Sequence, residues 1–62
     1  MFGAKWDAYV NLGMAYLLAE DPDNALRCLD RAVEMAPDAD FAKGWRNRAL
    51  AEVARARAAR RT

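Results

Sequence analysis

The side chains that could carry out chemistry are few in this chain of 62 residues. Cys28 is the single cysteine and there is no histidine, so no imidazole can activate the thiol and no internal disulfide can form. A zinc site needs several thiol or imidazole ligands, which this composition lacks. Tyr9 and Tyr16 suit packing better than acid catalysis, the carboxylates show no paired arrangement, and no glycine-rich phosphate loop is present. Because a catalytic site needs a nucleophile, a base and a stabilising group in one pocket, we expect a non-catalytic protein without metal or cofactor.

The basic side chains are concentrated in the last third of the chain. Residues 1–40 contain eight acidic and three basic side chains, whereas residues 41–62 contain seven basic and one acidic. The basic end could bind nucleic acid phosphates or another acidic surface, and the candidates are Arg46, Arg48, Arg55, Arg57, Arg60 and Arg61. These arginines scatter around a helix without aromatic residues among them after Trp45, so a solvated helix explains them better than nucleic acid binding. A third interpretation is contact with the acidic half of a neighbouring copy.

The elements that would position these residues are helices. Apolar residues recur every three or four positions in three segments, which predicts an all-α fold. Asp21 and Pro22 suit the cap and the first residue of a helix. Pro37 ends that helix, because proline lacks a backbone N–H and restricts the residue before it, and Asp38 or Asp40 can cap the next one. The expected helices span about 6–19, 22–35 and 41–60.

The first two helices carry a spaced set of aromatic, large apolar and small residues, which reads Tyr9-x2-Leu12-Gly13-x2-Tyr16, then Ala25-x3-Leu29-x2-Ala32-x4-Pro37. This set resembles the tetratricopeptide repeat, although Tyr9 stands where the repeat has tryptophan and Leu29 where it has an aromatic residue. The resemblance covers about one repeat, residues 6–39. It implies an antiparallel helix-turn-helix pair, the unit of an α-solenoid, with a third helix that caps the pair. We expect a single domain over residues 1–62.

Gly13 predicts close packing of the helix pair. Glycine inside a helix costs roughly 1 kcal/mol relative to alanine, so we expect another backbone to approach this position closely. Small residues of the second helix should face Gly13, Leu12 and Tyr16, with Leu29 filling the space beside them. The third helix should present one apolar stripe, formed by Phe41, Trp45, Ala49, Val53 and Ala56.

The first helix carries more apolar surface than one neighbour can cover. A second stripe, Trp6, Val10, Met14 and Leu17, lies beside the one that contains Leu12 and Tyr16, and Leu18 widens it. The resemblance implies that this face lines a groove for a peptide or a partner helix, with Trp6, Asp7, Val10, Asn11, Met14, Leu17 and Leu18 as the partner-binding candidates. The alternative is that the third helix covers the stripe within the same chain.

The small size of the chain predicts help from outside. A domain of this length buries only about 60% of its unfolded surface, and such repeats normally need about three units in a row. We therefore expect a protein–protein interaction module or scaffold that forms a homo-oligomer, or docks as a small subunit on a larger protein or complex. An excerpt of a longer repeat array remains an alternative. The longest apolar run is too short to span a membrane, and the lone thiol and absence of a secretion signal favour a cytoplasmic location.

Overall fold

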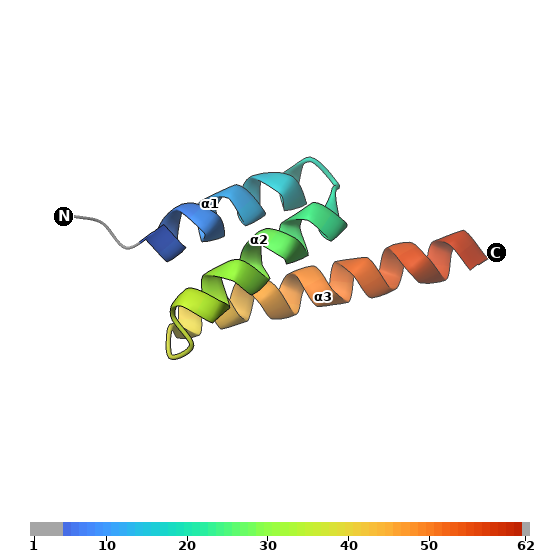
Figure 1. The fold of residues 1–62 in the computed structure, drawn as a ribbon. Coiled ribbons are helices and arrows are strands. Elements are labelled where there is room, and N and C mark those ends of the chain that lie inside the picture. The colour runs from blue at the N-terminus through green and yellow to red at the C-terminus, as the bar shows by residue number, and fades with distance from the viewer. Residues whose placement is uncertain (1–4, 62) are drawn as a thin grey trace.

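Three helices make up the computed structural model, which describes the backbone of residues 5–61 and the side chains of residues 5–60. They are α1 (Lys5–Leu18), α2 (Pro22–Met35) and α3 (Asp40–Arg61), and no strand occurs within this range. Figure 1 shows α1 and α2 as an antiparallel pair, with α2 lying between α1 and α3. The predicted all-α fold, a helical hairpin followed by a third helix, is confirmed.

The turn after α1 is held by two backbone hydrogen bonds. The N–H of Glu20 donates to the carbonyl of Leu17 at 3.1 Å, and the N–H of Asp21 donates to the carbonyl of Tyr16 at 2.8 Å. This pair of bonds is the Schellman arrangement, which satisfies the last carbonyls of a helix. It places Glu20 at φ 61°, in the left-handed region that glycine usually occupies. The chain therefore reverses direction within a few residues.

Both ends of α2 follow from the residues at them. Asp21 caps the helix, because its Oδ1 accepts from the N–H of Asn24 at 3.4 Å and its Oδ2 accepts from the side-chain amide of Asn24 at 2.8 Å. Pro22 takes the first helical position, where no N–H is needed. At the other end, the helix stops at Met35, two residues before Pro37.

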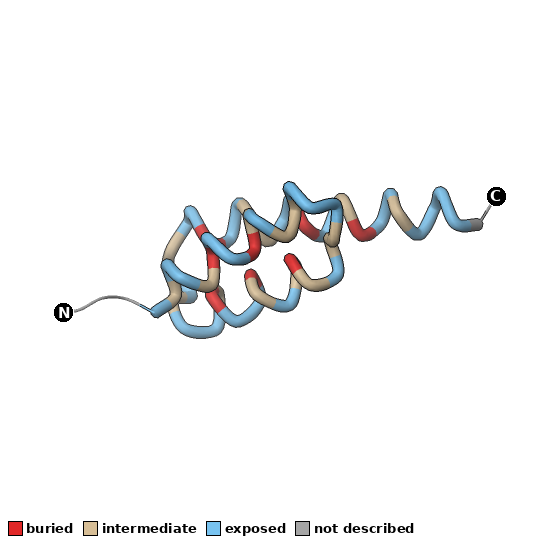
Figure 2. Tube along the Cα trace, turned by 90° about the horizontal axis from the view of Figure 1, so that it is seen from above, coloured by how far each residue is buried: buried red, intermediate tan, exposed pale blue. Residues whose placement is uncertain are grey.

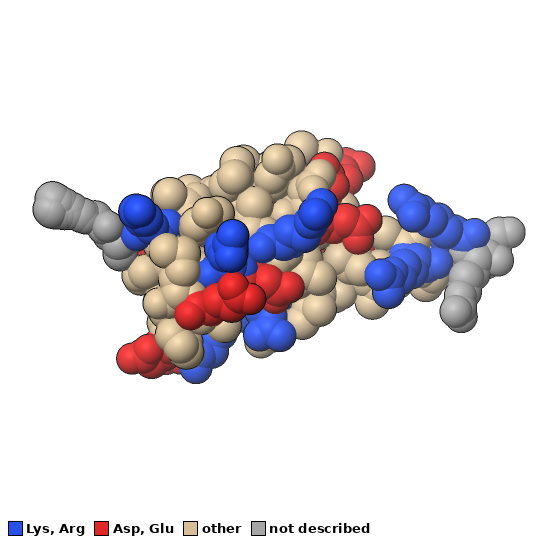
Figure 3. Space-filling model, in the orientation of Figure 1, with Lys and Arg blue, Asp and Glu red and all other residues tan. Residues whose placement is uncertain are grey.

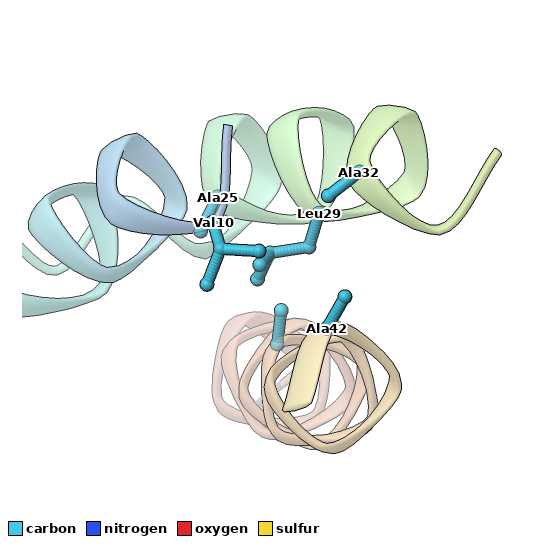
Figure 4. Close-up of a cluster of buried hydrophobic side chains, with 6 residues drawn as sticks. Val10, Ala25, Leu29, Ala32 and Ala42 are labelled. Carbon is cyan, nitrogen blue, oxygen red and sulfur yellow. The ribbon is translucent and has the colours of Figure 1, made fainter. Parts of the chain in front are cut away.

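The core of the hairpin is built around Leu29. Figure 4 shows this side chain pointing from α2 toward Val10 of α1, with Ala25 and Ala32 on the same side of α2, and all four residues are fully buried. A Cβ atom placed on Gly13 would lie only 2.6 Å from Leu29 Cγ. The atoms nearest to Gly13 are thus side-chain atoms of Leu29, not the neighbouring backbone that we expected. Glycine is needed there because Leu29 occupies the space.

The face by which α3 packs differs in part from the predicted stripe. Ala49 and Val53 are buried as expected, and Trp45 is half-buried. Phe41, however, is 56% exposed, and its neighbour Ala42 is fully buried instead. A small side chain at position 42 lets the start of α3 lie close to the hairpin, which turns the bulky phenylalanine outward. Including Phe41 in the buried stripe was therefore wrong.

The expectation that Leu12 packs within the hairpin is also wrong. Its side chain is 47% exposed, whereas Tyr9 and Tyr16 are half-buried and pack against the core. The core lies on the side of α1 that carries Val10 and Gly13, so Leu12 projects toward open solvent.

The C-terminal part of α3 extends beyond the hairpin. With 22 residues against 14 in α1 and in α2, α3 is longer by about two helical turns. Figures 1 and 2 show this end projecting past both other helices. Val53 is the last buried residue, and residues 54–60 are all exposed except Ala56, which is half-buried. We call residues 54–60 the α3 overhang.

Candidate interaction surface

A groove runs between α1 and α3. Its volume is about 310 Å³, and it is lined by Met14, Leu17 and Leu18 from α1 and by Trp45, Arg48 and Glu52 from α3. In α1, Leu17 and Leu18 follow Met14 by three and four residues, so the three side chains lie along one face of that helix. In α3, Trp45, Arg48 and Glu52 are also separated by three and four residues, and they lie along one face of α3. α1 and α3 both pack on the same central helix, α2. The groove therefore exists only because both helices pack on α2.

The walls of the groove are mostly apolar. Met14, Leu17 and Trp45 are half-buried and pack against the core, which gives the groove a floor that cannot easily move. Leu18 stands at the rim and is 87% exposed, which is an unfavourable position for a leucine in water. An apolar side chain from another protein that entered this groove would be removed from water, which is energetically favourable.

Two charged side chains border the groove. The guanidinium carbon of Arg48 lies 5.7 Å from the ring centre of Trp45, within the range of a cation–π contact. Glu52 Oε2 lies 3.4 Å from Arg55 Nη1, in an exposed pair one helical turn apart. The groove thus offers apolar walls with one cation and one anion at its border, a composition that suits recognition of a polypeptide better than catalysis.

The structure separates the partner-binding candidates of α1 into three groups. Val10 is fully buried in the core, so it is not part of the accessible surface, contrary to our expectation. Met14, Leu17 and Trp6 are half-buried, because α2 and α3 cover them in part. The exposed positions are Asp7, Asn11 and Leu18. The stripe is therefore covered in part within the chain, and Leu18 at its edge stays open to solvent.

The contribution of α3 to the groove was missed from the sequence. Trp45 was predicted to lie in the buried stripe, Arg48 was predicted only as a possible contact to a polyanion, and Glu52 was not singled out. The spacing of these three residues on one helical face was the available signal, but it could not show that this face lies beside α1.

Two of the candidate arginines are paired within the chain. Arg46 Nε lies 2.9 Å from Asp30 Oδ1 on α2, an ion pair without the alignment of a hydrogen bond. Arg55 pairs with Glu52 as described above. These pairs hold part of the positive charge of α3 close to carboxylates of the same chain, which weakens its attraction for phosphates.

Arg57 and Arg60 have a different environment. Both are exposed, and neither forms an ion pair with any carboxylate of the described residues. Figure 3 shows blue basic side chains over this end of α3. The side chain of Arg61 lies outside the described residues.

Cys28 is half-buried on α2. Burial raises the pKa of its thiol, and the neighbouring Arg27 lowers it by less. A raised pKa keeps the thiol protonated, so it is a poor nucleophile.

The chain was compared with protein families, with curated proteins and with solved structures. The family model described as tetratricopeptide repeat matches residues 6–39, which is more than half of the chain. The chain belongs to the tetratricopeptide repeat family. No curated protein and no solved structure gives a match.

The matched tetratricopeptide repeat coincides with the α1–α2 hairpin and the turn after it, and α3 caps this repeat. Repeats of this family generally mediate protein–protein interaction and are typically non-catalytic. Within the described residues, no helix is long and apolar enough to cross a membrane.

Proposed function

We propose that this tetratricopeptide repeat protein is a non-catalytic interaction module that self-associates, or docks as a small subunit on a larger protein, through the apolar face of α1. The surface consists of Met14, Leu17 and Leu18, and the groove extends it onto Trp45 of α3. The observation that carries the proposal is Leu18, a large apolar side chain that is 87% exposed at the rim of an apolar groove.

Energy considerations support this choice of surface. Full burial of a leucine side chain is worth about 1.5–3 kcal/mol, and almost all of that gain is still available at Leu18. Tryptophan is among the residues that most often dominate the binding energy of an interface, and Trp45 lies at the base of this one. The domain is also small, so a partner that covers the groove would add substantially to its stability.

The test is the Leu18→Glu variant, with Leu50→Glu as the matched control. Leu50 is an exposed leucine of α3 that does not line the groove. Molar mass by light scattering is followed over a wide range of concentration, with helicity by circular dichroism on the same samples. High salt is used throughout, because it screens charge pairs and leaves apolar contacts in place. We expect the wild type and Leu50→Glu to assemble and Leu18→Glu to remain monomeric.

A wild type that stays monomeric would reject self-association and leave docking on another protein. That alternative predicts that a fluorescent probe of apolar surface binds the wild type and Leu50→Glu, and binds Leu18→Glu less. Equal assembly and equal probe binding by all three proteins would contradict the proposed surface altogether.

The polyanion-binding alternative for α3 has less support. Arg46 and Arg55 are paired with carboxylates, and Arg48 lies over Trp45 rather than in a basic cluster. Among the described candidates, only Arg57 and Arg60 are exposed with neither an ion pair nor a ring contact.

A further inference from the structure

The α3 overhang is a helical segment with almost no packing from its own chain. After Val53 its residues are exposed on nearly every side. Short helical segments without tertiary contacts are marginal in water, and helical stability in proteins comes mainly from packing. A helix that continues for about two turns past its support therefore has a surface that a partner can stabilise.

One side of the overhang has a distinct chemistry. Ala54 and Ala58, one turn apart, form with Arg57 and Arg60 a shallow hollow of about 570 Å³. The alanines give it a low apolar floor, and the arginines supply positive charge beside it. No carboxylate of the described residues pairs with either arginine. The hollow thus suits a small, acidic and well-ordered protrusion.

The α1–α2 turn of the same protein has the complementary chemistry. Glu20 in the turn and Asp23 in the first turn of α2 are exposed, and neither forms an ion pair within the described residues. Ala19, also exposed, precedes them. The backbone of the turn is held rigidly by the Schellman bonds and by the Asp21 cap. In Figure 3, red acidic side chains lie over this turn, opposite in sign to the end of α3.

The positions of the two surfaces determine the symmetry of a contact between them. Figure 1 shows that the α1–α2 turn and the α3 overhang lie at the same end of the molecule. A two-fold rotation about an axis at that end would bring each overhang onto the turn of the other copy. Such a contact is isologous and closed, because each copy gives and receives the same surface.

We infer that two copies of this chain form a symmetric dimer in which the α3 overhang of each lies on the α1–α2 turn of the other. Arg57 and Arg60 pair with Glu20 and Asp23 of the second copy, and Ala54 and Ala58 lie against its turn. This contact goes beyond the proposed function, because it uses neither Met14, Leu17 nor Trp45. It is small and polar, in the class of transient interfaces, so the dimer forms reversibly and dissociates as salt is raised.

Charge reversal tests this dimer directly. One variant carries Arg57→Glu and Arg60→Glu, and the other carries Glu20→Lys and Asp23→Lys. At low salt each variant alone should dimerise about tenfold or more weakly than the wild type, because like charges then face each other. An equimolar mixture should recover the dimer, since both contacts between unlike variants again join opposite charges. Sedimentation velocity gives the molar mass of the species in all three samples.

The control keeps the charge change and moves its position. Arg27→Glu with Arg31→Glu alters two exposed arginines of α2 that lie away from the overhang, and this variant should dimerise like the wild type. Circular dichroism checks that every variant remains helical. Recovery in the mixture cannot arise from unfolded chains, so it also guards against a folding artefact.

Three results would overturn the inference: a wild type that is monomeric at low salt, reversal variants that dimerise like the wild type, or a mixture that stays monomeric. A monomeric wild type that binds a single-stranded oligonucleotide, with loss of binding in Arg57→Glu/Arg60→Glu, would assign the overhang to a polyanion instead. The proposed groove contact is separable from these outcomes, because it persists in high salt, where the charge-paired dimer is lost.

Discussion

The α1–α2 hairpin and the α3 overhang are both regular helix, yet different interactions hold them. In the hairpin, Leu29 is fully buried and occupies the space beside Gly13, and Asp21 caps the second helix. Residues 54–60 of α3 have no buried side chain. Their helix depends on the good helical propensity of alanine and arginine and on favourable placement of positive charge at a C-terminal end.

The comparison shows where this small protein can accept change. The buried residues of the hairpin are restricted by their neighbours in space, so substitutions at those positions affect the fold. The overhang is restricted only by the need to remain helical, so its surface is free to serve contacts with another molecule. Substitutions in the hairpin and in α3 should therefore change the stability of the fold by different amounts.

Removing buried side chains should give the largest effect. Leu29→Ala removes the centre of the hairpin core and should cost about 2–5 kcal/mol, which is comparable to the whole stability of a domain of this size. Val53→Ala, at the last buried position before the overhang, should cost about 2 kcal/mol or less. Urea unfolding at one protein concentration, followed by circular dichroism, measures both. Equal losses would show that α3 is held as tightly at its end as the hairpin is at its centre.

The two helical glycines should respond in opposite directions to alanine. In Gly13→Ala, the new Cβ would lie 2.6 Å from Leu29 Cγ, and this overpacking outweighs the gain of about 1 kcal/mol in helix propensity. In Gly44→Ala, no atom lies within 4 Å of the new Cβ, so the same gain of about 1 kcal/mol should appear as added stability. The unfolding midpoint should therefore fall for the first variant and rise for the second. A rise for both would mean that Leu29 moves aside without cost.

The smallest effect should come from the ion pair that links the hairpin to the packed part of α3. Asp30 and Arg46 join α2 to α3 at 2.9 Å, but both side chains are partly exposed to solvent. A double-mutant cycle with Asp30→Asn and Arg46→Gln should give a coupling energy of about 1 kcal/mol or less, and it should decrease in salt. A coupling of several kcal/mol would indicate that this pair, and not apolar packing, positions α3.

Much of the hairpin could be predicted because its determinants are local. The turn and both ends of α2 are set by Asp21, Pro22 and Pro37, which act through the backbone of their immediate neighbours. A short stretch of sequence is therefore enough to predict them. Gly13 pointed correctly to a close contact, although the contacting atoms belong to the Leu29 side chain.

Predictions that required the rotation of one helix against another were less accurate. Val10, Leu12 and Phe41 were each placed on a face of the correct helix, but which face is covered depends on the other two helices. Ala42 was overlooked because alanine carries little hydrophobic signal, although its small size allows the close approach of α3. The groove combines residues of α1 and α3 that are far apart in the chain.

The sequence by itself determined the three helices, the antiparallel hairpin and the membership of the tetratricopeptide repeat family. These features depend on the periodicity of apolar residues and on capping groups, which act over a few residues along the chain. Only the tertiary structure decided which side of α1 stays open, how far α3 extends past its support, and that the acidic turn and the basic overhang share one end of the molecule. These features depend on the packing angle and the relative lengths of whole helices, and no local pattern encodes where separate helices come to lie in space.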